Sequence, residues 1–310
     1  MKNLSKAVEI LRAGGLVAFP TETVYGLGAD AKNPAAVAKI FSVKGRPADH
    51  PVIVHLAAFS ELSEWVVDDI SFDAKKLAAA FWPGPLTLIF KKNPGISALL
   101  TGGQDTIGIR IPHHPVALEL LREFGGGLAA PSANRFGHIS PTTAAAVYEE
   151  LGDSVDLILE GGQCEVGLES TILDVSSDVI SILRPGMIGA KQIEKILGKN
   201  ISLKQKKSPR VSGSLESHYA PRTKTILLSA DEIKNYLSRE KKLVVIAISE
   251  MKLSDVEYFQ MSSSPEKYAH DLYFILREFD KKNFDEIIIE KVPDFVEWDA
   301  VRDRLQRAAG

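Results

Sequence analysis

The sequence is poor in cysteine: Cys164 is the only one in 310 residues. One thiol cannot form an intrachain disulfide or a multi-cysteine zinc or iron–sulfur site, and such scarcity is typical of proteins from a reducing compartment. No apolar run approaches the roughly 18 residues that a membrane-spanning helix needs, and the N-terminal residues lack the apolar core of a signal peptide. We therefore expect a cytoplasmic protein with no membrane partner.

An excess of either charge is also lacking, because 37 Lys and Arg residues face 40 Asp and Glu residues, for a formal net charge of -3. This balance excludes a protein that coats a polyanion or an anionic membrane through its overall charge, so any contact with nucleic acid must be local. The remaining composition, 45% hydrophobic and 25% charged, is that of a globular protein, and the length suggests about two domains.

The hydrophobic pattern divides the chain into two different α/β parts. Up to residue 199, short strand-like runs without helices between several of them predict a mixed sheet flanked by helices, with residues 21–30 as a loop and a helix over 141–151. From residue 223, strands and helices alternate three times, which predicts a small parallel, Rossmann-like α/β domain over 223–310. Residues 200–222 lack clear periodicity and are predicted to form a linker. The charged residues near Trp298 have the pattern of solvated helix faces.

Familiar metal and nucleotide motifs are missing. None of the seven histidines forms a His-x-x-x-His pair, so the sequence predicts no transition-metal site. The Gly198-Lys199 pair has Ile193 where the first glycine of a phosphate-binding loop belongs and Asn200 where Ser or Thr belongs. Any nucleotide must therefore bind without that loop.

A loop of hydroxyls, one carboxylate and glycines follows the first predicted strand. Its sequence over 20–28 is Pro-Thr-Glu-Thr-Val-Tyr-Gly-Leu-Gly. Open α/β sheets bind ligands at the carboxyl ends of their strands, which favours a site here, although a glycine-rich turn with threonine capping explains the same residues.

Three cationic residues suit an anionic ligand. Lys44 and Arg46 flank a glycine in a constrained loop, where Arg offers a fork and Lys a point charge to phosphate oxygens; the alternative is a solvated basic turn. Period-two alternation places Thr106, Gly108 and Arg110 on one strand face, and an Arg on such a face needs a carboxylate or a phosphate.

Small polar residues follow other predicted strands. Pro131-Ser132-Ala133-Asn134 lets the backbone approach a ligand, and Ser140 is expected to open the next helix. No Gly-x-Ser-x-Gly elbow surrounds Ser132, so it is not read as a nucleophile. Ser170 and Arg184 again place a hydroxyl and an Arg at strand ends.

Taken together and in order, these segments resemble the YrdC-like family over roughly residues 5–195. With His218-Tyr219-Ala220-Pro221 and a C-terminal α/β domain, the chain is similar to the two-domain threonylcarbamoyl-AMP synthases of that family. The resemblance implies a twisted mixed sheet with a large cleft over 1–199 and a linker over 200–222 that closes over it. It also implies synthesis of threonylcarbamoyl-AMP and pyrophosphate from L-threonine, bicarbonate or CO2, and ATP, for modification of the adenosine beside the tRNA anticodon.

The resemblance also implies roles for individual residues. L-threonine would be bound by Thr23, His55, Arg110, Ala130 and Ser170. ATP would be surrounded by Arg46, His50, Thr106, Ser132, Asn134, Ser140, Arg184 and Tyr219. Lys44 and Arg46 would be catalytic through charge stabilisation, and Mg2+ would be held mainly by the ATP phosphates rather than by a protein metal site. Two positions depart from the family: His50, where many relatives carry Asn, and residues 211–217, where a Ser-Pro-Gly-Met stretch is common.

Two other functions remain alternatives. The basic residues between 191 and 210 are compatible with an RNA-binding module as well as with a solvated linker. A carbamoyl transferase that uses a related domain usually carries cysteine-rich zinc segments before it, and only Cys164 exists here. The resemblance further implies that downstream transfer proteins receive the product, with at most transient contact to tRNA. For the C-terminal domain we expect either gating of the linker or binding of a partner.

Overall fold

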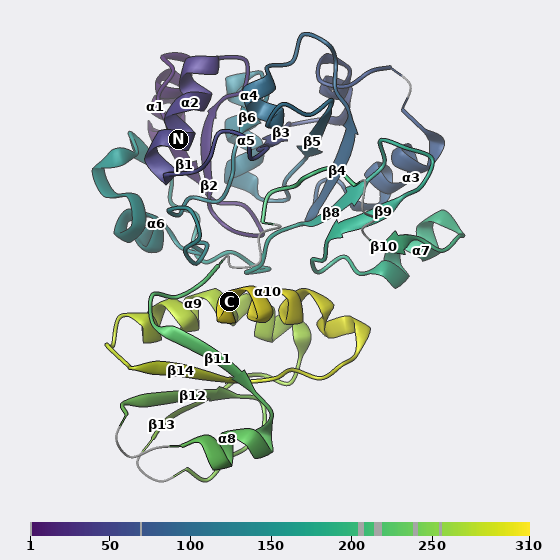
Figure 1. Ribbon diagram of the computed structural model, residues 1–310. Helices are drawn as coiled ribbons and strands as arrows, with labels where there is room; N and C mark the ends of the chain where they lie inside the picture. Colours follow the sequence, from purple (N-terminus) through teal and green to yellow (C-terminus); the bar gives the residue numbers. More distant parts are fainter. Residues whose placement is uncertain (1, 69, 204–207, 214–218, 238–240, 254–255) are drawn as a thin grey trace.

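Two separate sheets organise the chain, one in each half (Figure 1). This computed structural model describes residues 2–68, 70–203, 208–213, 219–237, 241–253 and 256–310. The N-terminal sheet has ten strands in the order β10-β9-β8-β4-β5-β3-β6-β2-β1-β7, and the C-terminal sheet has four in the order β11-β14-β12-β13. The predicted fold class is thereby confirmed.

The N-terminal sheet mixes parallel and antiparallel neighbours: for example, β3 is parallel to β5 and antiparallel to β6. Its strands are β1 (Val17–Phe19), β2 (Gly26–Asp30), β3 (Ile53–His55), β4 (Leu86–Lys91), β5 (Thr106–Arg110), β6 (Leu128–Ala129), β7 (Leu157–Ile158), β8 (Thr171–Asp174), β9 (Ser181–Arg184) and β10 (Ser202–Leu203). The α-helices around it are α1 (Lys2–Arg12), α2 (Pro34–Lys44), α3 (Phe72–Phe81), α4 (Ala98–Thr101), α5 (Pro115–Phe124), α6 (Ala144–Leu151) and α7 (Ala190–Leu197), with short 3-10 helices at Phe59–Glu64 and Gly152–Ser154.

Helix α2 places the basic loop, and its ends follow from the sequence. The Asn33 side chain accepts hydrogen bonds from the amides of Ala35 and Ala36, and Pro34 occupies the first turn, where its missing N–H costs nothing. Gly45 ends the helix with φ 61°, a left-handed conformation that glycine adopts without strain. Lys44 and Arg46 therefore leave the helix end in fixed directions.

The prediction of a loop over residues 21–30 is wrong in its second half, because Gly26–Asp30 forms β2 and pairs antiparallel with β1. A Cβ on Gly28 would lie 2.7 Å from a ring carbon of Phe19, so this strand needs glycine where a turn was predicted. The helix predicted from residue 141 begins only at Ala144, capped by the Thr143 side chain.

The C-terminal domain is a fully parallel sheet, as predicted, with one strand more than the pattern indicated. Its elements are β11 (Lys224–Leu228), α8 (Ala230–Tyr236), β12 (Leu243–Ala247), β13 (Glu257–Gln260), α9 (Pro265–Asp280), β14 (Glu286–Glu290), a 3-10 helix at Val296–Trp298 and α10 (Asp299–Ala309). The additional strand β13 lies at the sheet edge and is only partly buried, so the pattern of apolar residues that would predict this strand from the sequence is weak.

Helices α9 and α10 lie between the C-terminal sheet and the N-terminal domain (Figure 1). Val24, Ile139 and Leu168 of the N-terminal domain are buried in the same apolar cluster as residues of these helices. The expectation that the charged residues near Trp298 are all solvated is wrong for Arg304, which is fully buried in α10. No helix in the described part of the chain is both long and apolar enough to cross a membrane.

Candidate active site

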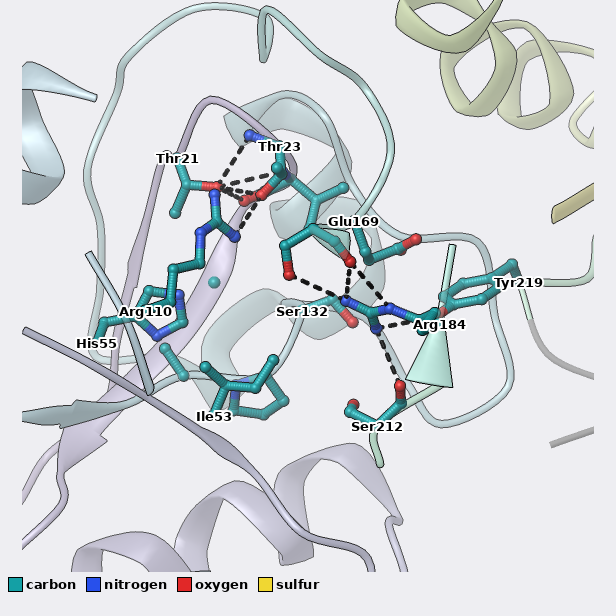
Figure 2. A pocket seen from close by; sticks show the side chains of 15 residues that line it. Thr21, Thr23, Ile53, His55, Arg110, Ser132, Glu169, Arg184, Ser212 and Tyr219 are labelled. Carbon is teal, nitrogen blue, oxygen red and sulfur yellow. Dashed lines mark hydrogen bonds between the residues drawn. The ribbon is translucent and has the colours of Figure 1, made fainter. Parts of the chain in front are cut away.

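A pocket opens in the N-terminal domain on the side that faces the C-terminal domain, with about 490 Å³ of empty space including its mouth. It is lined by Thr21, Thr23, Val24, Gly26, Ile53, His55, Arg110, Ala130, Pro131, Ser132, Glu169, Ser170, Arg184, Ser212 and Tyr219. Figure 2 shows two opposite groups of side chains, which we call the Arg110 end (Thr23, His55 and Arg110) and the Arg184 end (Arg184, Ser212 and Tyr219). Ser170, whose carbonyl and hydroxyl accept hydrogen bonds from Arg184, belongs to the Arg184 end.

The loop after β1 builds the Arg110 end. The Thr21 hydroxyl donates to the Val24 carbonyl at 2.7 Å and accepts from the amides of Thr23 and Val24, which closes a local turn. Arg110 on β5 donates from Nη1 to the Thr23 hydroxyl at 2.8 Å. Its Nη2 lies 2.7 Å from Oε1 of Glu22 in a buried ion pair that lacks hydrogen-bond geometry. The Arg110 end therefore contains a guanidinium whose positive charge is balanced by the Glu22 carboxylate.

His55 lies beside Arg110 in the sheet, because β3 and β5 pair with these residues in register. Burial, reinforced by the positive charge of Arg110, lowers the pKa of His55 to about 3 against a smaller opposing effect of the Ile53 backbone. The imidazole is therefore neutral near pH 7. Its Nδ1 is buried and makes no hydrogen bond of good geometry, although the Ile53 backbone lies near enough to oppose the lowering of the pKa.

Lys44 and Asn134 hold the turn at residues 131–134. The Lys44 ammonium donates to the carbonyls of Ser132 and Asn134, and the Asn134 amide donates to the carbonyls of Arg135 and His138, each at 2.8 Å. Burial, reinforced by the charge of Arg46, lowers the pKa of Lys44 well below its ordinary value. The turn that carries Ser132 into the pocket is thus fixed from behind.

Arg184 organises the opposite end from β9. Its guanidinium donates to the Ser170 carbonyl at 2.9 Å and to the Ser212 carbonyl at 3.0 Å, and Nη1 lies 3.5 Å from the Tyr219 hydroxyl. Arg46 reaches the same region, because its Nη2 donates to the Pro51 carbonyl at 2.9 Å and to the Ser212 hydroxyl at 3.4 Å. Two arginines therefore converge on the segment at Ser212.

Glu169 is the acidic residue of the pocket lining. It accepts hydrogen bonds from the Ser140 hydroxyl at 2.6 Å, from the Tyr273 hydroxyl at 3.0 Å and from Nε of Arg304 at 2.8 Å. Burial alone would raise its pKa, but the charges of Arg304 and Arg184 and the Ser140 hydrogen bond hold the pKa below the ordinary value. Glu169 is therefore an ionised, fully engaged carboxylate.

Family comparisons agree with this architecture. A family model described as "Telomere recombination" matches residues 9–186, and one described as "Threonylcarbamoyl-AMP synthase, C-terminal domain" matches residues 188–310. The threonylcarbamoyl-AMP synthase of Pyrococcus abyssi is 37% identical over 98% of this chain and 93% of that protein. That of Bacillus subtilis is 39% identical over 99% and 93%. The chain belongs to the threonylcarbamoyl-AMP synthase family.

A solved structure confirms the two-domain arrangement of this family. The Pyrococcus abyssi protein complexed with L-threonine superposes with a TM-score of 0.92 at 36% identity, covering 99% of this chain and 94% of that one. The family and the fold inferred from the sequence are thus confirmed for this chain. The domain boundaries at 199 and 222 stay predictions.

Eight of the residues that the sequence assigned to threonine or ATP line the pocket: Thr23, His55, Arg110, Ala130, Ser132, Ser170, Arg184 and Tyr219. Arg46 reaches the lining through Ser212, and Ser140 reaches it through Glu169. Thr106 lines a smaller adjoining pocket that also contains Ser212. Lys44 and Asn134 lie behind the turn, and His50 packs edge-on against Phe136.

Sequence reasoning missed the partners of these residues. Glu22 appeared in the 20–28 loop without a role of its own, and no role was assigned to Glu169, Tyr273 or Arg304, although these residues complete the two ends of the pocket. A buried cation needs a counter-charge, so Arg110 was a signal that a carboxylate lies nearby. For Arg304 the signal was its helical spacing with Val301, Leu305 and Ala308, which places it on the buried face of α10. His218 of the linker motif and most of the divergent stretch 211–217 lie outside the described residues.

Proposed function

We propose that this chain makes threonylcarbamoyl-AMP and pyrophosphate from L-threonine, bicarbonate or CO2, and ATP. The observation that carries the proposal is the pairing of the Arg110 end with the Arg184 end in one pocket, which suits an amino acid beside a nucleotide. The family membership and a relative whose structure holds L-threonine support it. Downstream proteins would transfer the product to the adenosine beside the tRNA anticodon, with only transient tRNA contact by this chain.

L-threonine occupies the Arg110 end in this proposal. Its carboxylate pairs with Arg110, whose ion pair with Glu22 keeps the guanidinium fixed before the substrate arrives. The neutral imidazole of His55, which lines the pocket, lies against a polar group of threonine. Thr23, Ala130 and Ser170 complete the contacts.

ATP occupies the Arg184 end and the adjoining surface. Arg46, Arg184 and Tyr219 lie around the nucleotide, together with His50, Thr106, Ser132, Asn134 and Ser140. The carboxylate of the pocket lining, Glu169, is already engaged by three donors, so the charge that faces the triphosphate comes from arginines. Mg2+ fits this arrangement as an ion held by the ATP phosphates, where it would neutralise their charge.

The reaction needs no covalent enzyme intermediate. The threonine amine attacks the carbon of CO2 or bicarbonate and loses a proton, which forms a carbamate, with a water released if bicarbonate is the source. A carbamate oxygen then attacks the α-phosphorus, and the bond to the bridging oxygen of pyrophosphate breaks. The protein contributes positioning in a closed pocket and charge stabilisation by Arg46 and Arg184, with Lys44 holding the Ser132 turn.

Pyrophosphate release tests the proposal. The chain is incubated with ATP, Mg2+ and bicarbonate, and with L-threonine, L-serine or no amino acid. We expect release that requires the amino acid and is fastest with L-threonine. Bound ATP without threonine-dependent release would contradict the proposal and favour a carbamoyl-phosphate reaction, whereas salt-sensitive tRNA binding in the absence of ATP would favour the RNA-binding alternative.

A further inference from the structure

Glu169 connects the pocket to the C-terminal domain. Its carboxylate lines the pocket and directly precedes Ser170 in the chain. Of its three hydrogen-bond donors, Ser140 belongs to the N-terminal domain, whereas Tyr273 and Arg304 lie on α9 and α10 of the C-terminal domain. The buried ion pair between Glu169 and Arg304, at 2.8 Å, therefore crosses the domain interface.

Arg304 also contacts the tyrosine that lines the Arg184 end. Its guanidinium lies 5.2 Å from the ring centroid of Tyr219, within the range of a cation–π interaction. The ring of Tyr273 lies 5.8 Å from that of Tyr219. Tyr219 has a φ of 61°, a left-handed conformation that a tyrosine keeps only where its surroundings hold it.

The same tyrosine faces Arg184 with its hydroxyl, at 3.5 Å (Figure 2). Its ring is thus held by the C-terminal domain while its hydroxyl lies at the Arg184 end of the pocket. The described contacts of Thr23, His55 and Arg110, in contrast, are with the N-terminal sheet and its loops. The polar contacts of the C-terminal domain are therefore made at one end of the pocket, whereas the loop of the Arg110 end meets that domain through the apolar side chain of Val24.

We infer that Arg304 is a positioning residue for the nucleotide end of the active site, acting through Glu169 and Tyr219. That this end binds a nucleotide rests on the proposed function, whereas the contacts of Arg304 with Glu169 and Tyr219 do not depend on it. Without the guanidinium, the buried Glu169 carboxylate next to Ser170 loses the counter-charge that is hydrogen-bonded to it and keeps only the charge of Arg184, so the carboxylate must shift toward another partner or take up a proton more readily. Tyr219 loses its cation–π partner at the same time and keeps the ring of Tyr273.

The test replaces Arg304 by glutamine, with Arg302→Gln as the matched control. Arg302 lies on the same helix, but its partners, Asp294, Asp299 and two carbonyls at residues 293 and 295, all belong to the C-terminal domain. Calorimetry measures the affinity for L-threonine and, separately, for α,β-methylene-ATP with Mg2+. Steady-state pyrophosphate release gives kcat and KM for ATP.

We expect Arg304→Gln to weaken α,β-methylene-ATP binding and to lower kcat/KM for ATP at least tenfold, while L-threonine affinity without nucleotide changes less than threefold. Arg302→Gln should stay within twofold of the unmodified chain in every measurement. Equal behaviour of the two variants would overturn the inference. So would a parallel loss of threonine and nucleotide affinity, because that result indicates a purely structural role.

Arg304→Lys keeps the test decisive if the glutamine variant does not fold. Lysine retains the charge but loses the planar fork and the flat surface against Tyr219, so we expect at least a threefold loss for the nucleotide. Unmodified affinity in this variant would overturn the inference. If the unmodified chain releases no pyrophosphate, the proposed function fails by itself, and the two calorimetric affinities still test the role of Arg304.

Discussion

The two ends of the pocket are built in different ways. The Arg110 end is assembled from β1, β3, β5 and the loop after β1. Its two opposite charges, on Arg110 and Glu22, both belong to the N-terminal domain and compensate one another. The Arg184 end needs the N-terminal sheet, the segment at Ser212 and Tyr219, and α9 and α10 of the other domain. A pocket end whose polar contacts lie within one domain is thus joined to an end that depends on how the two domains dock.

The largest effect is expected from Arg110→Gln, which tests the self-contained end. The change removes the partner of the threonine carboxylate and leaves Glu22 as an uncompensated buried charge, which costs about 3–5 kcal/mol of stability. We expect threonine affinity to fall roughly a hundredfold in calorimetry and the melting temperature to drop. Adding Glu22→Gln should restore stability but not affinity; unchanged threonine binding in the single variant would contradict the assignment.

Arg46→Ala tests the other end. Loss of a charge-assisted contact of about 1.5–3 kcal/mol should lower turnover more than tenfold, while threonine affinity changes little. Arg12→Ala, an exposed arginine on α1 that donates to the carbonyls of Glu123 and Phe124, is the control for removing a surface cation. Unchanged kinetics in a folded Arg46→Ala variant would refute its role.

The pH dependence of the unfolding free energy tests whether His55 is buried as a neutral imidazole. Because the folded-state pKa is about 3 and the unfolded value is ordinary, near 6.5, the unfolded chain takes up the proton first as the pH falls. The histidine therefore costs stability progressively below pH 6.5, by up to about 1.4 kcal/mol per pH unit until about pH 3. Chemical unfolding of the unmodified chain and of His55→Gln should diverge in this window; parallel curves would show that His55 is not buried as a neutral group.

The smallest effect is expected from Tyr219→Phe. The ring remains between Arg304 and Tyr273, and only the hydroxyl facing Arg184 at 3.5 Å is lost, so KM for ATP should change two- to threefold. Tyr219→Ala, which removes the ring, should have a much larger effect on the same parameter. If both variants behave alike, the ring contacts do not position the nucleotide end.

The sequence predicted the residues of the pocket better than their partners. Polar residues at strand ends identified Thr23, Ser170 and Arg184, and period-two alternation identified Arg110, because both patterns have a local signature. Glycines concealed β2, since Gly28 fits against Phe19 in a strand but resembles a turn residue in the sequence.

The contact between Glu169 and Arg304 spans 135 residues and two domains. On α10, Arg304 shares a helix face with the apolar residues Val301, Leu305 and Ala308, so its spacing predicts burial but does not identify Glu169 as its partner. Long-range ion pairs of this kind depend on tertiary geometry, which no periodicity in the sequence encodes.

The most direct test of the proposed chemistry follows the carbon atom. The chain is incubated with ATP, Mg2+, L-threonine and 13C-bicarbonate, and the products are identified by mass spectrometry. The account predicts threonylcarbamoyl-AMP that carries one 13C atom, formed in step with pyrophosphate. An adenylate of threonine without the label, or pyrophosphate with no adenylate that contains threonine, would contradict it.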